Sequence, residues 1–455
     1  METPIYNFIK RYNEKLSVRF HMPGHKGRPF LGCEAWDITE VSGADSLYEA
    51  EGIISQSEKN AAALFGSGAT FYSTEGSSQC IKAMLYLMLG KKEKNKRKRP
   101  YIIAGRNAHK AFLHGAALLD LDILWWYPRI RDSVCSCDLK AEDLEQLFLE
   151  QEEKPIGVYL TSPDYLGNML EIDKIAKVCH KYDCYLAVDN AHGAYLHFLN
   201  PSLHPLDLGA DLCCDSAHKT LPVLTGGAYL HVARGREEEF QGQERTALSL
   251  FGSTSPSYLT LSSLDLCNAY LEDSYTQKLE EVIESINGVK DQIRQKGWNI
   301  LETEPLKLTL RMKETEREKQ ENGLALAKQL EKMGIHTEYA DPDYVVCMIT
   351  PENGKEDLIK LEKSLEAIKR EYKAEEIETI TWQIQYHEQV LTVREASFLP
   401  REEISVEDSV GRVCALPTVS CPPAIPIVVS GERVCKEDLS LFHYYGIKKI
   451  SVVCK

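Results

Sequence analysis

The sequence has no long apolar run and no excess of positive charge, and each absence excludes a class of protein. No stretch reaches the ~18 consecutive apolar residues that a transmembrane helix needs. Residues 1–20 mix charges with scattered apolar side chains, so we expect neither a membrane partner nor a secretory signal. The 53 basic residues are outnumbered by 68 acidic ones, which gives a net charge of −15. Because nucleic acid binds cationic surfaces, this balance argues against a nucleic-acid partner.

Cysteine is present, but not in a metal-binding spacing. The 14 cysteines are scattered and form no CxxC pair. We therefore expect no metal site and interpret them as reduced thiols of a cytoplasmic protein. Hydrophobic residues make up 43% and charged residues 27% of the 455 residues. This composition excludes a disordered chain, a collagen-like repeat and a small disulfide scaffold, and the length allows two or three domains.

Strand and helix patterns alternate over residues 37–232. Apolar residues at helical spacing predict an amphipathic helix over residues 81–89 that ends at Gly90. Short apolar runs predict buried strands at residues 101–104, 157–160, 185–188, 212–214 and 228–232. Because strands that alternate with helices form parallel sheets, we predict an α/β fold with a mostly parallel sheet covered by helices. Ligands of such sheets bind beyond the carboxyl ends of the strands.

The pattern changes near residue 270. A long polar helix is predicted to run toward Lys296, and leucines that alternate with polar residues predict a half-exposed strand at residues 306–311. Helical patterns near residues 324–333 and 358–368 flank a predicted strand at residues 344–349, and the proline-containing tail at residues 396–455 is predicted to be irregular. We therefore divide the chain into an N-terminal segment (1–36), a large domain (37–269) and a smaller C-terminal α+β domain (270–455).

One stretch is strongly basic. Seven of the nine residues at 91–99 are Lys or Arg, between Gly90 and Pro100. An anion-binding patch is one interpretation. The one we favour is a solvated loop between a helix and a strand.

Two of the predicted strand ends carry groups that suit an anionic or a flat ligand. The stretch STEGSSQ (73–79) opens a helix, and glycine with free hydroxyls at a helix start suits a phosphate. A serine N-cap explains this stretch equally well. The stretch RNAHK (106–110) follows another strand. Its His109 could stack on a flat cofactor or move a proton, although a lone histidine is more often a surface residue.

Two further strand ends carry a carboxylate and an amine. Asp189 ends an apolar run, so its carboxylate would need a cationic or N–H partner, and a helix N-cap is the alternative. Lys219 follows another strand, thirty residues later, within DSAHKT (215–220). Its amine could be held near neutral as a nucleophile, or the side chain could simply extend to solvent.

The four loops together predict one ligand. In chain order they supply a phosphate cradle, a stacking group, a carboxylate for a ring nitrogen and a lysine that can form an imine. These are the four groups that pyridoxal phosphate requires. The sequence therefore predicts a pyridoxal 5'-phosphate site at one edge of the sheet.

The motifs resemble those of the fold-type I pyridoxal-phosphate enzymes, specifically the short bacterial branch of the Orn/Lys/Arg decarboxylase family. The resembling stretches are HMPGHKG (21–27), DITE (37–40), DSL (45–47), GSS (76–78), RNAHK (106–110), TSPDY (161–165), DNAHG (189–193), SAHKT (216–220) and STSPSY (253–258). In the tail, PRE (400–402), PPAIP (422–426) and GE (431–432) are similar to the family's C-terminal segment. The resemblance covers nearly the whole chain.

This resemblance implies a role for each matching residue. Lys219 would bind the cofactor aldehyde as an imine, and Asp189 would pair with the pyridine nitrogen. His109 and Ala191 would pack on the two faces of the ring. Lys219 or His218 could return a proton to the substrate Cα. The other cofactor-binding residues, which would hold the phosphate or line its pocket, are Gly76, Ser77, Ser78, His192, Ser216 and His218.

The resemblance also implies a reaction and a partner. The substrate would be a basic amino acid, and its decarboxylation would place the enzyme in polyamine biosynthesis. We favour arginine among arginine, lysine and ornithine, by analogy with the short branch. Asp45, Asp164 and Glu432 are the candidates for the carboxylate that binds the distal cation. The loop at residues 254–258 would reach into a partner's active site, which implies a homodimer or a larger homo-oligomer.

Five positions depart from the family pattern. They are Asn190 in place of Glu, Ala111 of Ser, Ser46 of Asp, Cys421 of Tyr and Ala424 of Gly. None removes the lysine or the ring carboxylate, so they bear on substrate fit more than on the cofactor. Two alternatives stay open. One is another reaction of the same cofactor, by an aminotransferase or an aldolase-type lyase, and the other is a catalytically silent scaffold.

Overall fold

The computed structural model describes residues 1–90, 99–129, 132–312, 322–368, 384–417 and 424–454. The basic run at 91–98 and the departure at Cys421 lie outside these residues. The chain forms two compact units. The first comprises Met1–Pro100, Phe148–Leu160 and Ile172–Thr276, and the second comprises Tyr101–Leu147, Thr161–Glu171 and Gln277–Lys455.

The larger sheet has seven strands in the order β1-β7-β6-β5-β4-β2-β3. They are β1 (Ala69–Ser73), β2 (Tyr101–Gly105), β3 (Asp122–Trp126), β4 (Gly157–Thr161), β5 (Tyr185–Asp189), β6 (Leu212–Asp215) and β7 (Ala228–Val232). The pairs β2–β3 and β5–β6 are parallel, whereas β7 runs antiparallel to both β6 and β1. The predicted α/β class with a mostly parallel sheet is confirmed, and so are the five predicted strands.

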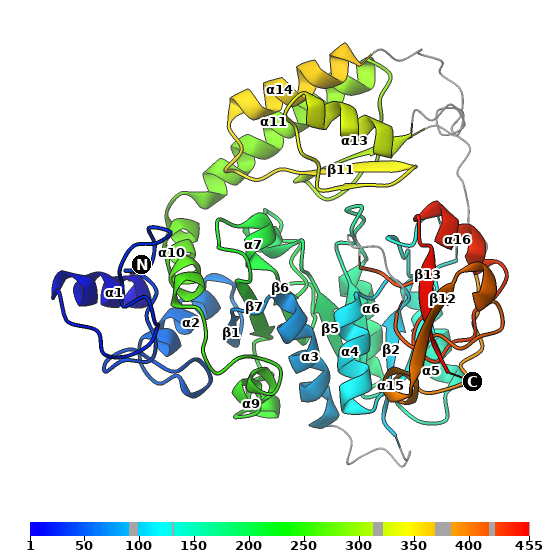
Figure 1. Cartoon of the computed structure of the whole chain (residues 1–455), viewed down its shortest axis with the longest axis horizontal. Coiled ribbons are helices and arrows are strands. Elements are labelled where there is room, and N and C mark those ends of the chain that lie inside the picture. Colours follow the sequence, from blue (N-terminus) through cyan, green and yellow to red (C-terminus); the bar gives the residue numbers. More distant parts are fainter. Residues whose placement is uncertain (91–98, 130–131, 313–321, 369–383, 418–423, 455) are drawn as a thin grey trace. The chain divides into compact units, whose positions relative to one another are not determined.

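Helix α3 (Ser77–Met88) packs against β5, β6 and β7 in the first unit (Figure 1). Ile81, Met84, Leu85 and Met88 are each at most 1% exposed. Burial of each such side chain contributes about 1.5–3 kcal/mol, so the apolar stripe fixes this helix on the sheet. The other helices of this unit are α1 (Pro4–Glu14), α2 (Ile53–Leu64), α6 (Ile172–Lys181), α7 (Ala217–Thr220), α8 (Glu237–Phe240), α9 (Glu244–Ser249) and α10 (Tyr258–Asp273).

The second unit contains a smaller antiparallel sheet in the order β10-β11-β9-β8. Its strands are β8 (Asn299–Ile300), β9 (Lys307–Arg311), β10 (Tyr339–Ala340) and β11 (Tyr344–Met348). The predicted helices are present as α11 (Tyr275–Gln295), α13 (Gly323–Lys332) and α14 (Lys355–Ala367). Two further helices, α4 (Lys110–Leu119) and α5 (Ala141–Glu150), follow β2 and β3 in the chain. Helix α4 belongs to the second unit, as does α5 except for its end from Phe148 onward, which belongs to the first.

Strand β9 differs from the half-exposed strand that the sequence predicted. Lys307 and Thr309 are both fully buried. The Lys307 ammonium donates to the Asp164 carbonyl at 2.9 Å and lies 3.6 Å from the Glu304 carboxylate. A lysine can be buried when its charge is paired in this way, and the sequence pattern alone does not reveal the pairing.

The tail is more regular than predicted. Strands β12 (Arg401–Ser405) and β13 (Lys449–Val453) form an antiparallel pair. The tail also contains the helices α15 (Val393–Phe398), which precedes β12, and α16 (Asp438–Tyr444), which precedes β13. Apolar side chains of the tail, among them Val428, Phe442 and Val452, belong to one buried cluster with Tyr344 and Val346 of β11. The prediction of an irregular segment was therefore wrong, because short strands with charged outer faces carry little periodic signal.

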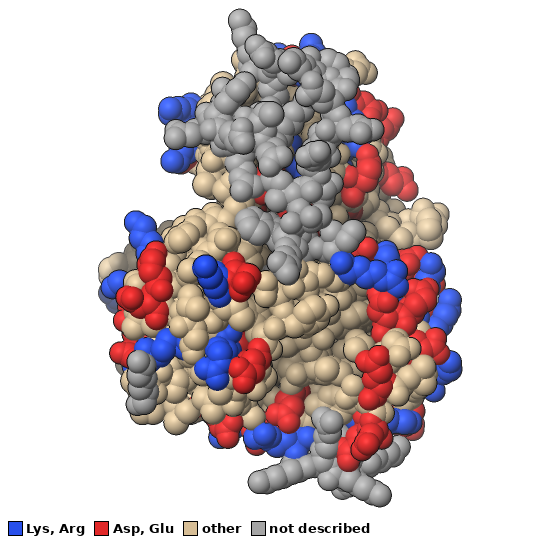
Figure 2. Space-filling view, turned by 90° about the vertical axis from the view of Figure 1, so that its right-hand side faces the viewer, with Lys and Arg blue, Asp and Glu red and all other residues tan. Residues whose placement is uncertain are grey.

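Charged side chains of both signs are interspersed on the face of the molecule that Figure 2 shows. Acidic and basic groups lie next to one another there, with apolar and uncharged residues between them. Within the described ranges, no helix combines the length and the apolar character that a membrane crossing requires.

Candidate active site

Lys219 lies in α7, a one-turn helix that directly follows β6. Its ammonium nitrogen is 2.9 Å from Nε2 of His192, which belongs to the loop after β5. Strands β5 and β6 are parallel neighbours, so the loops at their carboxyl ends lie side by side. The fold thus brings together two segments that are separated by a long crossover in the sequence.

Asp189 is the last residue of β5 and is 2% exposed. Its carboxylate accepts hydrogen bonds from the Tyr159 hydroxyl at 3.0 Å and from the Ala191 N–H at 3.2 Å. Burial raises the pKa of Asp189, while the charge of Lys219 and these hydrogen bonds oppose the rise. A buried carboxylate of this kind is stabilised further by a cationic N–H partner.

The start of α3 is a candidate anion site. Gly76 occupies the N-cap with a φ of +71°, and no side chain caps the helix there. Its own N–H donates to the Gly226 carbonyl at 2.8 Å, and a Cβ at Gly76 would lie 4.0 Å from Cε1 of His218. The Ser216 hydroxyl donates to the Ser77 hydroxyl at 2.7 Å, which brings the α7 turn against the start of α3. Uncapped N–H groups and adjacent hydroxyls suit a phosphate.

His218 faces the same turn. Its backbone N–H donates to the Gly227 carbonyl at 3.2 Å, and its Nδ1 lies 3.0 Å from that carbonyl. Burial lowers the pKa of His218, and the neighbouring charge of Lys219 lowers it further. A neutral imidazole is therefore favoured beside the lysine at neutral pH.

His109 belongs to the second unit, at the N-cap of α4. Its Nδ1 accepts the Ala111 N–H at 3.1 Å. Arg106, in the loop between β2 and α4, is buried. It donates to the carbonyls of Pro426 and Ile427 at 3.1 and 2.8 Å and pairs with Glu432 at 3.2 Å. The C-terminal segment therefore holds the loop that bears His109.

The three carboxylates considered for the distal cation are all engaged within their own unit. Asp45 accepts the N–H groups of Gly52 and Ile54 at the start of α2. Asp164 accepts several backbone N–H groups, and burial raises its pKa to about 6. Glu432 accepts the Val429 N–H besides its pairing with Arg106. Sequence position did not reveal these local bonds.

The structure shows the surroundings of two of the positions that depart from the family pattern. Ala424 has a φ of +60°, a left-handed conformation that glycine adopts without strain, and its carbonyl accepts the Lys110 N–H at 3.0 Å. Asn190 is fully buried and donates to Asp215 at 2.7 Å. Neither Tyr159 nor Asp215 was singled out from the sequence, because a residue within a buried strand carries no local signal for a polar role.

Comparison with known proteins identifies the family. The model of the Orn/Lys/Arg decarboxylase major domain matches residues 3–309. An arginine decarboxylase of Bacillus subtilis is 28% identical over 96% of this chain and 92% of its own length, and one of Bacillus cereus is 26% identical over 97% and 99%. A crystal structure of the lysine decarboxylase LdcF of Francisella novicida is similar in fold, with a TM-score of 0.79 at 17% identity over 99% of this chain and 81% of the other. The chain therefore belongs to the Orn/Lys/Arg decarboxylase family, whose members are pyridoxal-phosphate-dependent carboxy-lyases.

Proposed function

We propose that the protein decarboxylates a basic amino acid, with pyridoxal 5'-phosphate bound at Lys219. The observation that carries the proposal is the pairing of an amine and a buried acid. Lys219 and Asp189 come from adjacent strand ends, and the charge of Lys219 acts on the Asp189 carboxylate. The uncapped start of α3 supplies a phosphate cradle beside them. These donors and acceptors fit the three polar parts of the cofactor, namely aldehyde, ring nitrogen and phosphate.

When bound, pyridoxal phosphate supplies an electron sink for the carbanion that remains after carbon dioxide leaves. Asp189 would keep the proton on the ring nitrogen through a charge-assisted hydrogen bond, with Tyr159 and the Ala191 N–H orienting its carboxylate. Gly76, Ser77, Ser78 and Ser216 would hold the phosphate, while Ala191 and His109 would pack on the ring.

Return of a proton to the substrate Cα needs a general acid, a group that holds a proton and releases it at neutral pH. The Lys219 amine is in hydrogen-bond contact with His192, and its charge acts on the imidazole of His218. We therefore assign proton return to Lys219 or His218, and a supporting role in orienting the amine to His192.

Arginine is the substrate that we favour. Two Bacillus relatives that span nearly all of this chain are named arginine decarboxylases. Because Asp45, Asp164 and Glu432 are engaged locally, we propose that the carboxylate for the distal cation comes from another position, and that a partner subunit completes the site. In the loop at residues 254–258, Thr254 and Ser255 are exposed and accessible to a partner, whereas Pro256 and Tyr258 are buried in their own chain. We also place the enzyme in the cytoplasm and in polyamine biosynthesis, and keep the proposed domains at 1–36, 37–269 and 270–455.

The test is product formation. The purified protein is incubated separately with arginine, lysine and ornithine in the presence of pyridoxal phosphate, and agmatine, cadaverine and putrescine are measured. We expect one amine to dominate. The variant Lys219→Ala should lose both the product and the visible absorbance that survives dialysis.

Other outcomes identify the alternatives. Turnover that requires a 2-oxo acid would indicate an aminotransferase, and cleavage of a β-hydroxy amino acid an aldolase-type lyase. A colourless protein that forms no amine would indicate a silent scaffold. An unchanged absorbance spectrum in Lys219→Ala would contradict the lysine assignment.

A further inference from the structure

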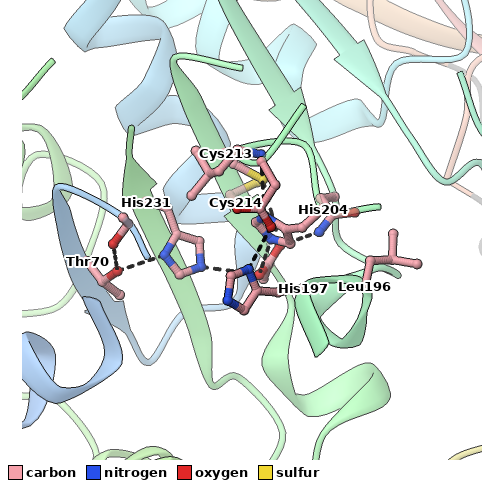
Figure 3. Close-up of polar contacts among 12 residues, drawn as sticks. Thr70, Leu196, His197, His204, Cys213, Cys214 and His231 are labelled. Carbon is pink, nitrogen blue, oxygen red and sulfur yellow. Dashed lines mark hydrogen bonds and ion pairs between the residues drawn. The ribbon is translucent and has the colours of Figure 1, made fainter. Parts of the chain in front are cut away.

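A buried polar cluster lies next to the candidate active site and has no role in it so far. Asp215 ends β6 and is fully buried. One of its carboxylate oxygens accepts from Nε2 of His204 at 3.1 Å and from Nε2 of His231 at 3.2 Å. The other oxygen accepts from the Asn190 amide at 2.7 Å. In Figure 3, His231 lies between Thr70 and His204.

The cluster has the composition of a metal site, but its protons are arranged for hydrogen bonding. The backbone N–H of Leu206 donates to Nδ1 of His204 at 3.4 Å, so Nδ1 is an acceptor and the Nε2 that faces Asp215 is the donor. The Thr70 hydroxyl is hydrogen-bonded to Nδ1 of His231 at 2.8 Å. The cluster is therefore a carboxylate held by three N–H donors.

These donors keep Asp215 ionised. Burial alone would raise the pKa of Asp215, but the interactions of its carboxylate with His204 and His231 outweigh burial and lower the pKa well below its usual range. Burial lowers the pKa of His231, which favours its neutral form. The carboxylate is thus a fixed anchor throughout the neutral pH range.

The anchor lies on the opposite face of the sheet from Asp189. Side chains alternate along a strand, so Cys213 and Asp215 share one face of β6 while Cys214 faces the other. Cys214 donates to the Asp189 carboxylate at 3.6 Å, which places Asp189 on the second face. Asn190 follows Asp189 and points back to Asp215, while its N–H continues the ladder to the Cys214 carbonyl at 2.9 Å.

Asn190 and Asp215 also occupy key positions in the two catalytic segments. Asp215 precedes Lys219 by four residues, and Asn190 lies between Asp189 and His192. The Asn190 amide packs so closely on the same loop that a Cβ at Gly193 would lie 2.0 Å from its Oδ1. The Asn190 carbonyl accepts the Gly193 N–H at 2.8 Å.

We propose that Asn190 and Asp215 are positioning residues, whose hydrogen bond fixes the Asp189–His192 loop against the turn that carries Lys219. His204 and His231 hold Asp215 in place for this purpose. The proposal rests on the proposed function, because it assigns the pair a role in placing the groups that would hold pyridoxal phosphate.

The test compares two buried amides of the same unit. Asn190→Asp sets a second carboxylate beside Asp215. Asn268→Asp is the matched control, because Asn268 is also fully buried, donates to the Tyr72 hydroxyl at 2.7 Å and, like Asn190, has an Oδ1 without a partner among the described residues. The dissociation constant for pyridoxal 5'-phosphate, the visible spectrum of the bound cofactor, kcat and thermal stability are measured for each.

We expect both variants to lose stability, but only Asn190→Asp to weaken cofactor binding, by about tenfold or more, and to lower kcat while KM changes less. Asp215→Asn is measured alone as well, and Asn190→Asp/Asp215→Asn, which restores one acid and one amide, should recover part of the lost affinity. If Asn190→Asp does not fold, Asn190→Ala tests the same loss without added charge.

Three results would overturn the proposal. The first is an Asn190 variant that matches Asn268→Asp in cofactor affinity and kcat. The second is a double variant whose losses are the product of the two single losses, because coupled residues do not behave independently. The third is a wild-type protein that takes up no pyridoxal phosphate at Lys219. That result overturns the proposed function as well, whereas the first two leave it standing.

Discussion

At the scale of single residues, the proposed chemistry depends on Asp189. Its carboxylate is buried, it is oriented by Tyr159 and Ala191, and the charge of Lys219 acts on it. Asp189→Asn keeps the shape and removes the negative charge. We expect kcat to fall by about 100-fold or more, because the ring nitrogen loses the partner that keeps it protonated, while cofactor content falls far less. Turnover and bound pyridoxal phosphate are measured on the same preparation.

Asp211 provides the comparison for that experiment. It is also buried in the first unit, but it pairs with Arg236 at 2.8 Å and with His180 at 3.1 Å. Asp211→Asn should lower stability and leave the turnover of the folded protein near normal. Near-normal turnover in Asp189→Asn would exclude the electron-sink role.

Whether a functional residue could be predicted from the sequence depends on its position relative to a predicted strand or helix. Lys219 and Asp189 follow predicted strands and Gly76 precedes a predicted helix, and these positions mark them as candidates. The partners that tune them do not stand out in the same way. Tyr159 lies inside β4, and Asp215 resembles any acid at a strand end. The engagement of Asp45, Asp164 and Glu432 depends on backbone N–H groups, which no residue pattern reports.

At the scale of elements, strongly periodic segments were predictable and short or paired ones were not. Helix α3 and the strands β5 and β6 follow from apolar periodicity, because each buries a continuous apolar surface. Strands β1 and β3 were missed, since each mixes polar and apolar residues over five positions. The burial of Lys307 was missed because its partners, Glu304 and the Asp164 carbonyl, make burial tolerable only after folding.

One contact between elements makes a prediction about stability. Asp265 in α10 is fully buried and accepts the Tyr6 N–H of α1 at 2.9 Å and the Ser57 hydroxyl of α2 at 2.6 Å. Burial raises the pKa of Asp265 to about 6 from 3.8. The folded state therefore holds the proton where the unfolded state releases it. Protonation of Asp265 in the folded state therefore stabilises the fold fully below pH ~4, and this stabilisation is lost as the pH rises through about 6.

Asp265→Asn removes the titration. The free energy of unfolding, measured with urea at several pH values from 4 to 7, should decline less steeply in the variant, by about 3 kcal/mol over the range. Asp273→Asn replaces an exposed carboxylate at the end of the same helix and should leave the parent decline in place. A decline of equal size in parent and Asp265→Asn would show that Asp265 does not carry the effect.

At the scale of the whole molecule, the N-terminal region carries several large apolar side chains that are exposed. Leu16, Val18, Phe20, Phe30 and Leu31 are 79–94% exposed within sixteen residues of sequence. Isolated exposed leucines are common, but apolar side chains gathered in one segment mark an interaction surface. In the homo-oligomer that we propose, in which a partner completes the active site, a second copy of this chain would cover the segment.

The prediction is that the protein is a homodimer or a larger homo-oligomer and that Phe20→Ser/Leu31→Ser weakens the assembly. Burial of a large apolar side chain contributes about 1.5–3 kcal/mol, so each substitution should raise the dissociation constant of the assembly by about tenfold or more. Sedimentation velocity over a range of protein concentrations measures the shift. Leu149→Ser, at a leucine that is 66% exposed on α5, is the control and should not change the assembly. If the subunits complete one another's sites, specific activity should fall together with the fraction assembled. A fully active monomer at low concentration would refute the shared site. The carboxylate that binds the distal cation of the substrate would then come from the same subunit.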